Sequence, residues 1–169
     1  MGEVVARDEA VARREIWGAA GERVVVTNGV FDLFHRGHAD ALAAARGFGR
    51  RLVVGLNDDA SVRRLKGAGR PLVPLEDRAA VLAALAAVDL VVPFAEDTPE
   101  ALIRALRPDV LVKGADYRPE DIVGGPFVES YGGCVERIEL TPGHSTSALV
   151  RKIVEAFGVG GAGGGREDG

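Results

Sequence analysis

The chain has 169 residues, of which 47% are hydrophobic and 27% charged, and its formal net charge is −4. This suits one folded domain with a buried core, and the acidic balance argues against binding to long nucleic acid, which requires a basic face. The single cysteine, Cys134, excludes an internal disulfide, and no apolar run approaches the roughly 20 residues of a membrane-spanning helix. We expect a cytoplasmic protein without a nucleic-acid or membrane partner.

Strand-like and helix-like segments alternate along the chain. An N-terminal helix is expected within residues 1–22, with helical character from Val4 to Ala19. Thr98 is the expected capping residue of a later helix, because proline follows it at the first turn. The glycine-rich segment 158–169 should be a disordered tail. Expected strands are 23–27, 52–56, 90–92, 110–113 and 134–140, and the other expected helices are 37–46, 58–65, 75–87, 98–106 and 145–157.

This alternation predicts the fold class. Strands that alternate with helices form βαβ units, which place parallel strands in one sheet with helices on both faces. Residues 23–157 should therefore form a single α/β, Rossmann-like, doubly wound domain around a five-stranded parallel sheet. Such sheets bind ligands at the carboxyl ends of their strands, so the motifs that follow strands are the candidates for function.

Two histidines lie just after the first of these strands, where a loop enters a helix. His35 and His38 are three residues apart, which places both imidazoles on one side of the first helical turn. Unpaired N–H groups at a helix start attract phosphate, and Gly37 lets a ligand approach the backbone closely. The arrangement favours a polyphosphate whose charge rises as pyrophosphate leaves.

These residues belong to a longer series of motifs. His35-Arg-Gly-His38, after Gly29-Val-Phe-Asp32, resembles the HxGH signature of the cytidylyltransferase-like nucleotidyltransferases. Within that superfamily the chain is most similar to the adenylyltransferase half of the bacterial ADP-heptose synthases. Further similar segments follow in the family's order: Asn57-Asp-Asp-Ala-Ser61, Arg64-Leu-Lys-Gly67, Arg70-Pro71, Glu76-Asp-Arg78, Leu111-Val-Lys-Gly-Ala-Asp-Tyr117 and Gly143-His-Ser-Thr-Ser147.

The resemblance implies an activity and its partners. A sugar 1-phosphate, D-glycero-D-manno-heptose 1-phosphate, would attack the α-phosphate of ATP and give ADP-heptose and pyrophosphate. Mg²⁺ would assist without a dedicated protein site, a separate sugar kinase would supply the sugar phosphate, and the enzyme would be a homodimer. Alternatives are glycerol 3-phosphate with CTP, FMN with ATP, and a nucleotide-binding module without turnover. An arginine that CTP-using relatives carry shortly before Ser145 is missing here, which weakens the assignment to CTP without establishing ATP.

The resemblance also implies roles for individual residues. The expected catalytic residues are His35, His38 and Lys66, and the acceptor is assigned to Asp32, Arg78 and Lys113. Arg63 and Arg64, beside Lys66, are read as a solvated charge run. No metal ligand is assigned. The nucleotide is assigned to Asn28, Gly29, Val30, Phe31, Gly37, Asp116, Gly143, Ser145, Thr146 and Ser147.

Several of these residues have a structural alternative. Arg78 could pair with Glu76, and Lys113 could extend to solvent. Asp116, after the fourth strand, could bind a ribose, a base or Mg²⁺, or it could form a turn. Ser145 or Thr146 could cap the last helix, a role compatible with binding phosphate at the amides that follow.

Overall fold

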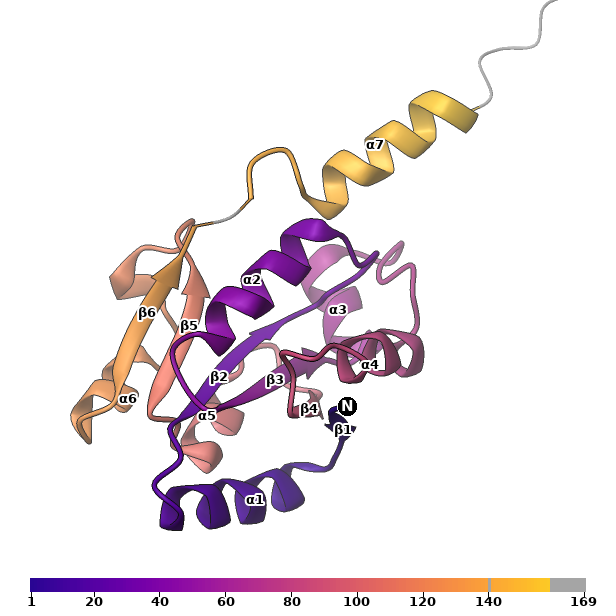
Figure 1. Cartoon of the computed structure of the whole chain (residues 1–169). Helices are drawn as coiled ribbons and strands as arrows, with labels where there is room; N and C mark the ends of the chain where they lie inside the picture. Colours follow the sequence, from indigo (N-terminus) through magenta and orange to yellow (C-terminus); the bar gives the residue numbers. More distant parts are fainter. Residues whose placement is uncertain (140, 159–169) are drawn as a thin grey trace, which may run out of the picture.

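The computed structural model describes residues 1–139 and 141–158, which fold around a six-stranded parallel sheet (Figure 1). The strand order is β1-β4-β3-β2-β5-β6. The chain adds β3 and β4 on one side of β2 and then crosses to place β5 on the other side. Strand order therefore reverses between β2 and β5, which is where such sheets bind ligands. The strands are β1 (Glu3–Val4), β2 (Val24–Gly29), β3 (Arg51–Asn57), β4 (Leu90–Phe94), β5 (Val110–Gly114) and β6 (Cys134–Ile138).

The sixth strand, β1, corrects the expected five-stranded sheet and the start of the first helix. Val4 was expected to be helical, but it pairs with Val91 at the free side of β4. The backbone N–H groups of Glu3 and Val5 donate to carbonyls in and beside β4. An exposed strand edge offers unpaired groups of this kind, and their pairing outweighs the weak helical preference of these few residues.

Helices cover both faces of the sheet, and each face has its own apolar core. On one face α1, α5 and α6 pack through side chains that include Ala10, Leu102 and Val128. On the other face α2 and α4 pack through side chains that include Leu42 and Leu82. Because Ala10 is fully buried, the N-terminal helix is an integral part of this fold. The helices are α1 (Arg7–Ala19), α2 (Arg36–Arg46), α3 (Asp59–Lys66), α4 (Leu75–Ala83), α5 (Glu100–Leu106), α6 (Gly125–Ser130) and α7 (Thr146–Phe157), with a 3₁₀ turn at Pro119–Asp121.

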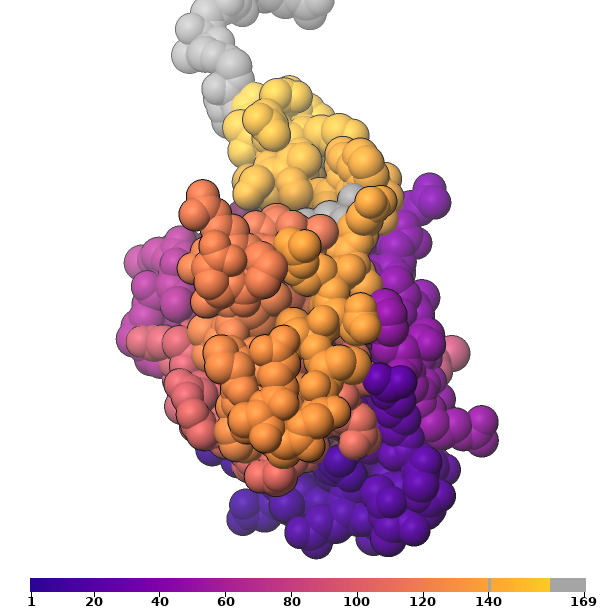
Figure 2. All heavy atoms as spheres, turned by 90° about the vertical axis from the view of Figure 1, so that its left-hand side faces the viewer, coloured from indigo at the N-terminus to yellow at the C-terminus, as the bar shows by residue number. Residues whose placement is uncertain are grey.

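The last helix differs most from expectation. The sequence predicts that residues 145–157 close the domain, but α7 extends away from the body and only its first turns approach α2 (Figures 1 and 2). None of its residues is buried, and Ile153, Val154 and Phe157 are exposed. The expected disordered tail lies, apart from Gly158, outside the described residues. Among the helices that the structure describes, none is long and apolar enough to cross a membrane.

Candidate active site

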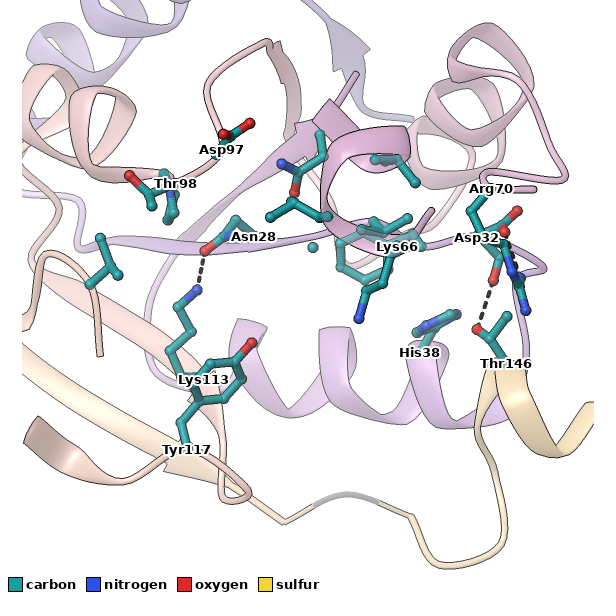
Figure 3. A pocket seen from close by; sticks show the side chains of 18 of the residues that line it. Asn28, Asp32, His38, Lys66, Arg70, Asp97, Thr98, Lys113, Tyr117 and Thr146 are labelled. Atoms are coloured by element: carbon teal, nitrogen blue, oxygen red, sulfur yellow. Dashed lines mark hydrogen bonds and ion pairs between the residues drawn. The ribbon is translucent and has the colours of Figure 1, made fainter. Parts of the chain in front are cut away.

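A cleft of about 690 Å³ opens at the carboxyl ends of β2, β3, β4 and β5, at the point where strand order reverses (Figure 3). Five chain segments that are far apart in sequence supply its walls: four follow strands, whose carboxyl ends meet at one edge of the sheet, and the fifth is the start of α7. The lining residues are Asn28, Gly29, Val30, Phe31, Asp32, His38, Asn57, Val62, Leu65, Lys66, Arg70, Asp97, Thr98, Pro99, Lys113, Tyr117, Asp121, Val123, Thr146 and Ser147.

The loop between β2 and α2 lines this cleft. Phe31 and Leu33 have φ angles of 51° and 47°, in the left-handed region that side chains other than glycine rarely adopt. A Cβ atom on Gly29 would lie 3.0 Å from the ring of Phe31, so glycine leaves the space that this ring occupies. Strained loops of this kind persist where surrounding contacts hold them, and they are concentrated at functional sites.

The two histidines of the HxGH motif lie against each other at the start of α2. The rings of His35 and His38 stack with centroids 3.8 Å apart and an interplanar angle of 16°. Phe31 and Phe34 pack against His38 at 5.2 and 5.6 Å. The Nδ1 atoms of both histidines are buried and make no hydrogen bond within the described part of the chain. His38 lines the main cleft, whereas His35 lines a smaller neighbouring cavity.

Both imidazoles are neutral at pH 7. Burial, and then the neighbouring His35, lower the pKa of His38 from 6.5 to about 4, against an opposite effect of Asp32. Burial, and then His144, lower the pKa of His35 as well. A neutral imidazole has one N–H donor. At pH 7 each neutral ring can therefore donate one hydrogen bond to a phosphate oxygen.

The low pKa of His38 predicts that stability falls in mild acid. Between pH 6.5 and about 4 the unfolded chain binds a proton at this residue and the folded chain does not, so acid favours unfolding. The loss should be roughly 1 kcal/mol at pH 5, after a discount for the part of the ring that water reaches. Denaturant unfolding at pH 7 and pH 5 measures it. His38→Gln should reduce the difference, and an equal difference in wild type and variant would contradict the assignment.

Asp32, which the sequence assigns to the acceptor, lines the cleft and is hydrogen-bonded within the protein. Its carboxylate accepts hydrogen bonds from the backbone N–H groups of Leu72 and Val73 at 3.0 Å and from Arg70 at 2.8 Å. Burial alone would raise the pKa of Asp32, but these three donors outweigh it and hold the pKa below its usual range. The backbone carbonyl of Asp32 also accepts from Thr146. Asp32 therefore joins the loop after α3 and the start of α7 to the HxGH loop.

Arg78 is also a structural residue, and the expected acceptor contact is not available to it. It is 2% exposed and does not line the cleft. Its guanidinium donates to the backbone carbonyls of Val30, Asn57 and Val73 and to the carboxylate of Asp59, at 2.6 to 2.9 Å. These acceptors occupy all three guanidinium nitrogens. Arg78 thus holds the ends of β2 and β3 and the loop before α4 in place.

The start of α7 combines capping with a position at the cleft. Ser145 caps the helix by accepting from the N–H of Ala148 at 3.1 Å, while Thr146 and Ser147 line the cleft. A Cβ atom on Gly37 would lie 3.0 Å from the backbone carbonyl of His144, so the loop before α7 packs directly on α2. Gly143 and Ser145 line the smaller cavity of about 70 Å³ beside His35. The amino-terminal end of α7 therefore adjoins the histidine pair.

Three basic side chains reach the cleft. Lys66, at the end of α3, extends into its middle, and Arg70 lies beside Asp32 (Figure 3). Lys113, at the end of β5, is only 8% exposed and donates a hydrogen bond to the side-chain oxygen of Asn28. Burial lowers the pKa of Lys113 to about 8, against an opposite effect of Asp116.

The cleft lining differs from the expected set of residues in further places. Asp116 is exposed and does not line the cleft, so its nucleotide contact stays a prediction. Thr98 and Tyr117, which do line it, were not identified from the sequence, although both follow strands of the sheet and that position was the available signal. Among the described residues, no group of three or more His, Cys, Asp or Glu side chains is arranged to hold a metal ion.

Solved structures of other proteins share this fold. The chain matches a lipopolysaccharide core biosynthesis protein from Thermoplasma volcanium with a TM-score of 0.59 and 24% identity, over 72% of this chain and 98% of that one. It matches a pantoate-beta-alanine ligase from Francisella tularensis with a TM-score of 0.63 and 12% identity, over 90% of this chain and 73% of that one. At such low identity these matches establish the fold alone.

Sequence comparison gives nearer relatives and a family. The bifunctional protein HldE of Magnetococcus marinus is 58% identical over 146 residues, and that of Halorhodospira halophila is 61% identical over 135 residues. The matches cover 85% and 80% of this chain but only 30% and 28% of those proteins. The family model described as cytidylyltransferase-like matches residues 26–150, from β2 into α7. Since this match spans most of the chain and includes the HxGH loop, the protein belongs to the cytidylyltransferase-like family.

Proposed function

We propose that the protein transfers AMP from ATP to a sugar 1-phosphate, D-glycero-D-manno-heptose 1-phosphate, and releases pyrophosphate. The observation that carries this proposal is the identity of 58% and 61% to two HldE proteins over 85% and 80% of the chain. These relatives support an adenylyltransferase domain of ADP-heptose synthesis. The chain spans about 30% of their length, so the proposal concerns this domain's step alone. A sugar kinase activity has to supply the sugar 1-phosphate.

The cleft is suited to in-line transfer. An oxygen of the sugar phosphate attacks the α-phosphorus of ATP, and the bond from that phosphorus to the oxygen bridging the α- and β-phosphates breaks as pyrophosphate leaves. The attacking oxygen is already an anion, so positioning and charge stabilisation suffice without a general base. We assign the triphosphate to His38, Lys66 and the start of α7, with His35 supporting His38 through the stacked rings.

Mg²⁺ fits this scheme as an ion that is bound by the triphosphate. The carboxylate of Asp32 is taken up by Arg70 and two backbone donors, and the described residues contain no cluster of three metal-ligating side chains. The ion would supply charge neutralisation on the phosphate oxygens. The protein itself would contribute the N–H and ammonium groups that donate hydrogen bonds to the triphosphate.

Pyrophosphate release tests the function directly. ATP, CTP and GTP should each be combined with heptose 1-phosphate, glycerol 3-phosphate and FMN. We expect ATP with heptose 1-phosphate to be the best pair, and ATP to exceed CTP by at least about tenfold in kcat/KM, or about 1.4 kcal/mol. The segment Leu140-Thr-Pro-Gly-His144 lacks the arginine of CTP-using relatives, which is the reason for this preference.

The other outcomes of this panel identify the alternatives. A preference for CTP with glycerol 3-phosphate, or for ATP with FMN, would replace the proposed substrates and leave the HxGH chemistry in place. Nucleotide binding without pyrophosphate release for any acceptor would indicate a module without turnover.

We also propose, from the resemblance, that the protein is a homodimer. The exposed apolar side chains of α7 are a surface that a partner would cover.

A further inference from the structure

The cleft contains a second group of polar side chains, away from the histidines. Figure 3 shows Lys113 extending toward Asn28, with Thr98 beyond Asn28 and with Lys66 between this group and His38. Lys113 and Asn28 lie at the carboxyl-terminal ends of β5 and β2, and Thr98 lies in the segment that follows β4. The transfer of AMP brings together two anionic substrates, and the donors around His38 and α7 account for only one of them.

Lys113 is a buried cation with a neutral partner. It is 8% exposed, its ammonium group donates to the amide oxygen of Asn28, and it forms no ion pair with any residue that the structure describes. Asp116 is exposed and influences Lys113 only through its field. Burying an ammonium group without an anion is costly. An anionic ligand at this end of the cleft would offset that cost and form charge-assisted hydrogen bonds.

Thr98 has a hydroxyl group without the structural role that the sequence predicts. The helix α5 is capped one residue later, at Pro99, and no side chain forms a capping hydrogen bond there. Thr98 instead lines the cleft and is exposed to it. A hydroxyl in this position can donate to, or accept from, a hydroxyl of a polyol.

We propose that Lys113, Asn28 and Thr98 form the subsite for the acceptor, with the phosphate of the sugar at Lys113 and a sugar hydroxyl at Thr98. This inference rests on the proposed function. It keeps the acceptor role that the resemblance implies for Lys113, moves Asn28 from the nucleotide to the acceptor, and adds Thr98. The order along the cleft is then pyrophosphate at His38, the α-phosphate near Lys66, the sugar phosphate at Lys113 and the sugar ring toward Thr98. That order places the attacking oxygen beside the phosphorus it attacks.

Binding measurements separate the two parts of the subsite. Heptose 1-phosphate and inorganic phosphate should each be titrated calorimetrically into the protein saturated with α,β-methylene-ATP, which cannot release pyrophosphate. We expect Lys113→Met to weaken both ligands about thirtyfold, because a charged hydrogen-bond donor is lost. Thr98→Val should weaken heptose 1-phosphate about fivefold and leave inorganic phosphate unchanged. Ser130→Ala removes a hydroxyl on α6, outside the cleft, and should change neither.

Steady-state kinetics complete the test. Thr98→Val and Lys113→Met should raise the KM for heptose 1-phosphate and change that for ATP by less than about twofold, whereas Lys66→Met should act mainly on ATP. Equal effects on both substrates, or unchanged acceptor binding in both variants, would overturn the subsite. Because Thr98 is exposed, its variant should fold even if Lys113→Met does not. Wild-type protein that binds heptose 1-phosphate without releasing pyrophosphate would contradict the proposed function and leave the subsite standing.

Discussion

His38→Ala should fold normally and lose at least about a hundredfold in kcat/KM for pyrophosphate release. Its ring lines the cleft, packs between aromatic side chains and the other histidine, and is neutral at pH 7. In the proposed reaction, a neutral ring held in this way would be a preorganised donor for the charge that develops on the leaving pyrophosphate. Removal of one such donor commonly costs about 3 kcal/mol in the transition state.

The third histidine of the chain, His144, provides the matched control. His144 lines the small cavity beside His35 but is exposed and lies outside the main cleft, so His144→Ala should change kcat/KM by less than about threefold. Circular dichroism and the melting temperature establish that both variants are folded. A folded His38→Ala protein with turnover within about fivefold of wild type would contradict the assignment of His38 to the reaction.

The sequence was sufficient for the parts of the fold that local signals encode. Alternating apolar runs and helix signals predicted β2 to β6 and the helices α2 to α5, and the cleft lies at the strand ends, where such sheets bind ligands. Thr98 shows where such signals fail. The hydroxyl, proline and acid order predicted a cap at Thr98, but the helix begins one residue later and leaves that hydroxyl at the cleft. A shift of one residue, which lies within the uncertainty of helix ends, changed its role from structure to candidate function.

Other features depend on partners that are distant in sequence. Val4 is in a strand because Val91 lies beside it, and no window of neighbouring residues contains that information. Asp32 and Arg78 were assigned to the acceptor because the family resemblance implies that role. Backbone groups of other loops orient these two side chains and form their hydrogen bonds within the protein. Sequence therefore located the site but could not distinguish residues that contact ligand from residues that hold the loops.

Replacement of Arg78 should produce the largest loss of stability. Arg78→Met keeps an apolar stem of similar length but leaves the carbonyls of Val30, Asn57 and Val73 without this donor. Buried polar groups without partners cost about 1–3 kcal/mol each, so a total of about 3–4 kcal/mol is expected when the loops relax in part. For a domain of this size the melting temperature should fall by roughly 10 °C.

The same variant tests the two assignments of Arg78 against each other. If Arg78 contacts the acceptor, its replacement should lower kcat/KM and leave the melting temperature unchanged. If Arg78 holds the loops, its replacement must lower the melting temperature. Arg13→Met removes an exposed arginine that pairs with Glu3 and Glu9, and should cost less than about 1 kcal/mol. Arg78→Lys keeps the charge but not the fork of donors, so it should be destabilised to an intermediate degree. If the Arg78→Met protein has the melting temperature of wild type but has lost activity, Arg78 contacts the acceptor and the structural assignment is wrong.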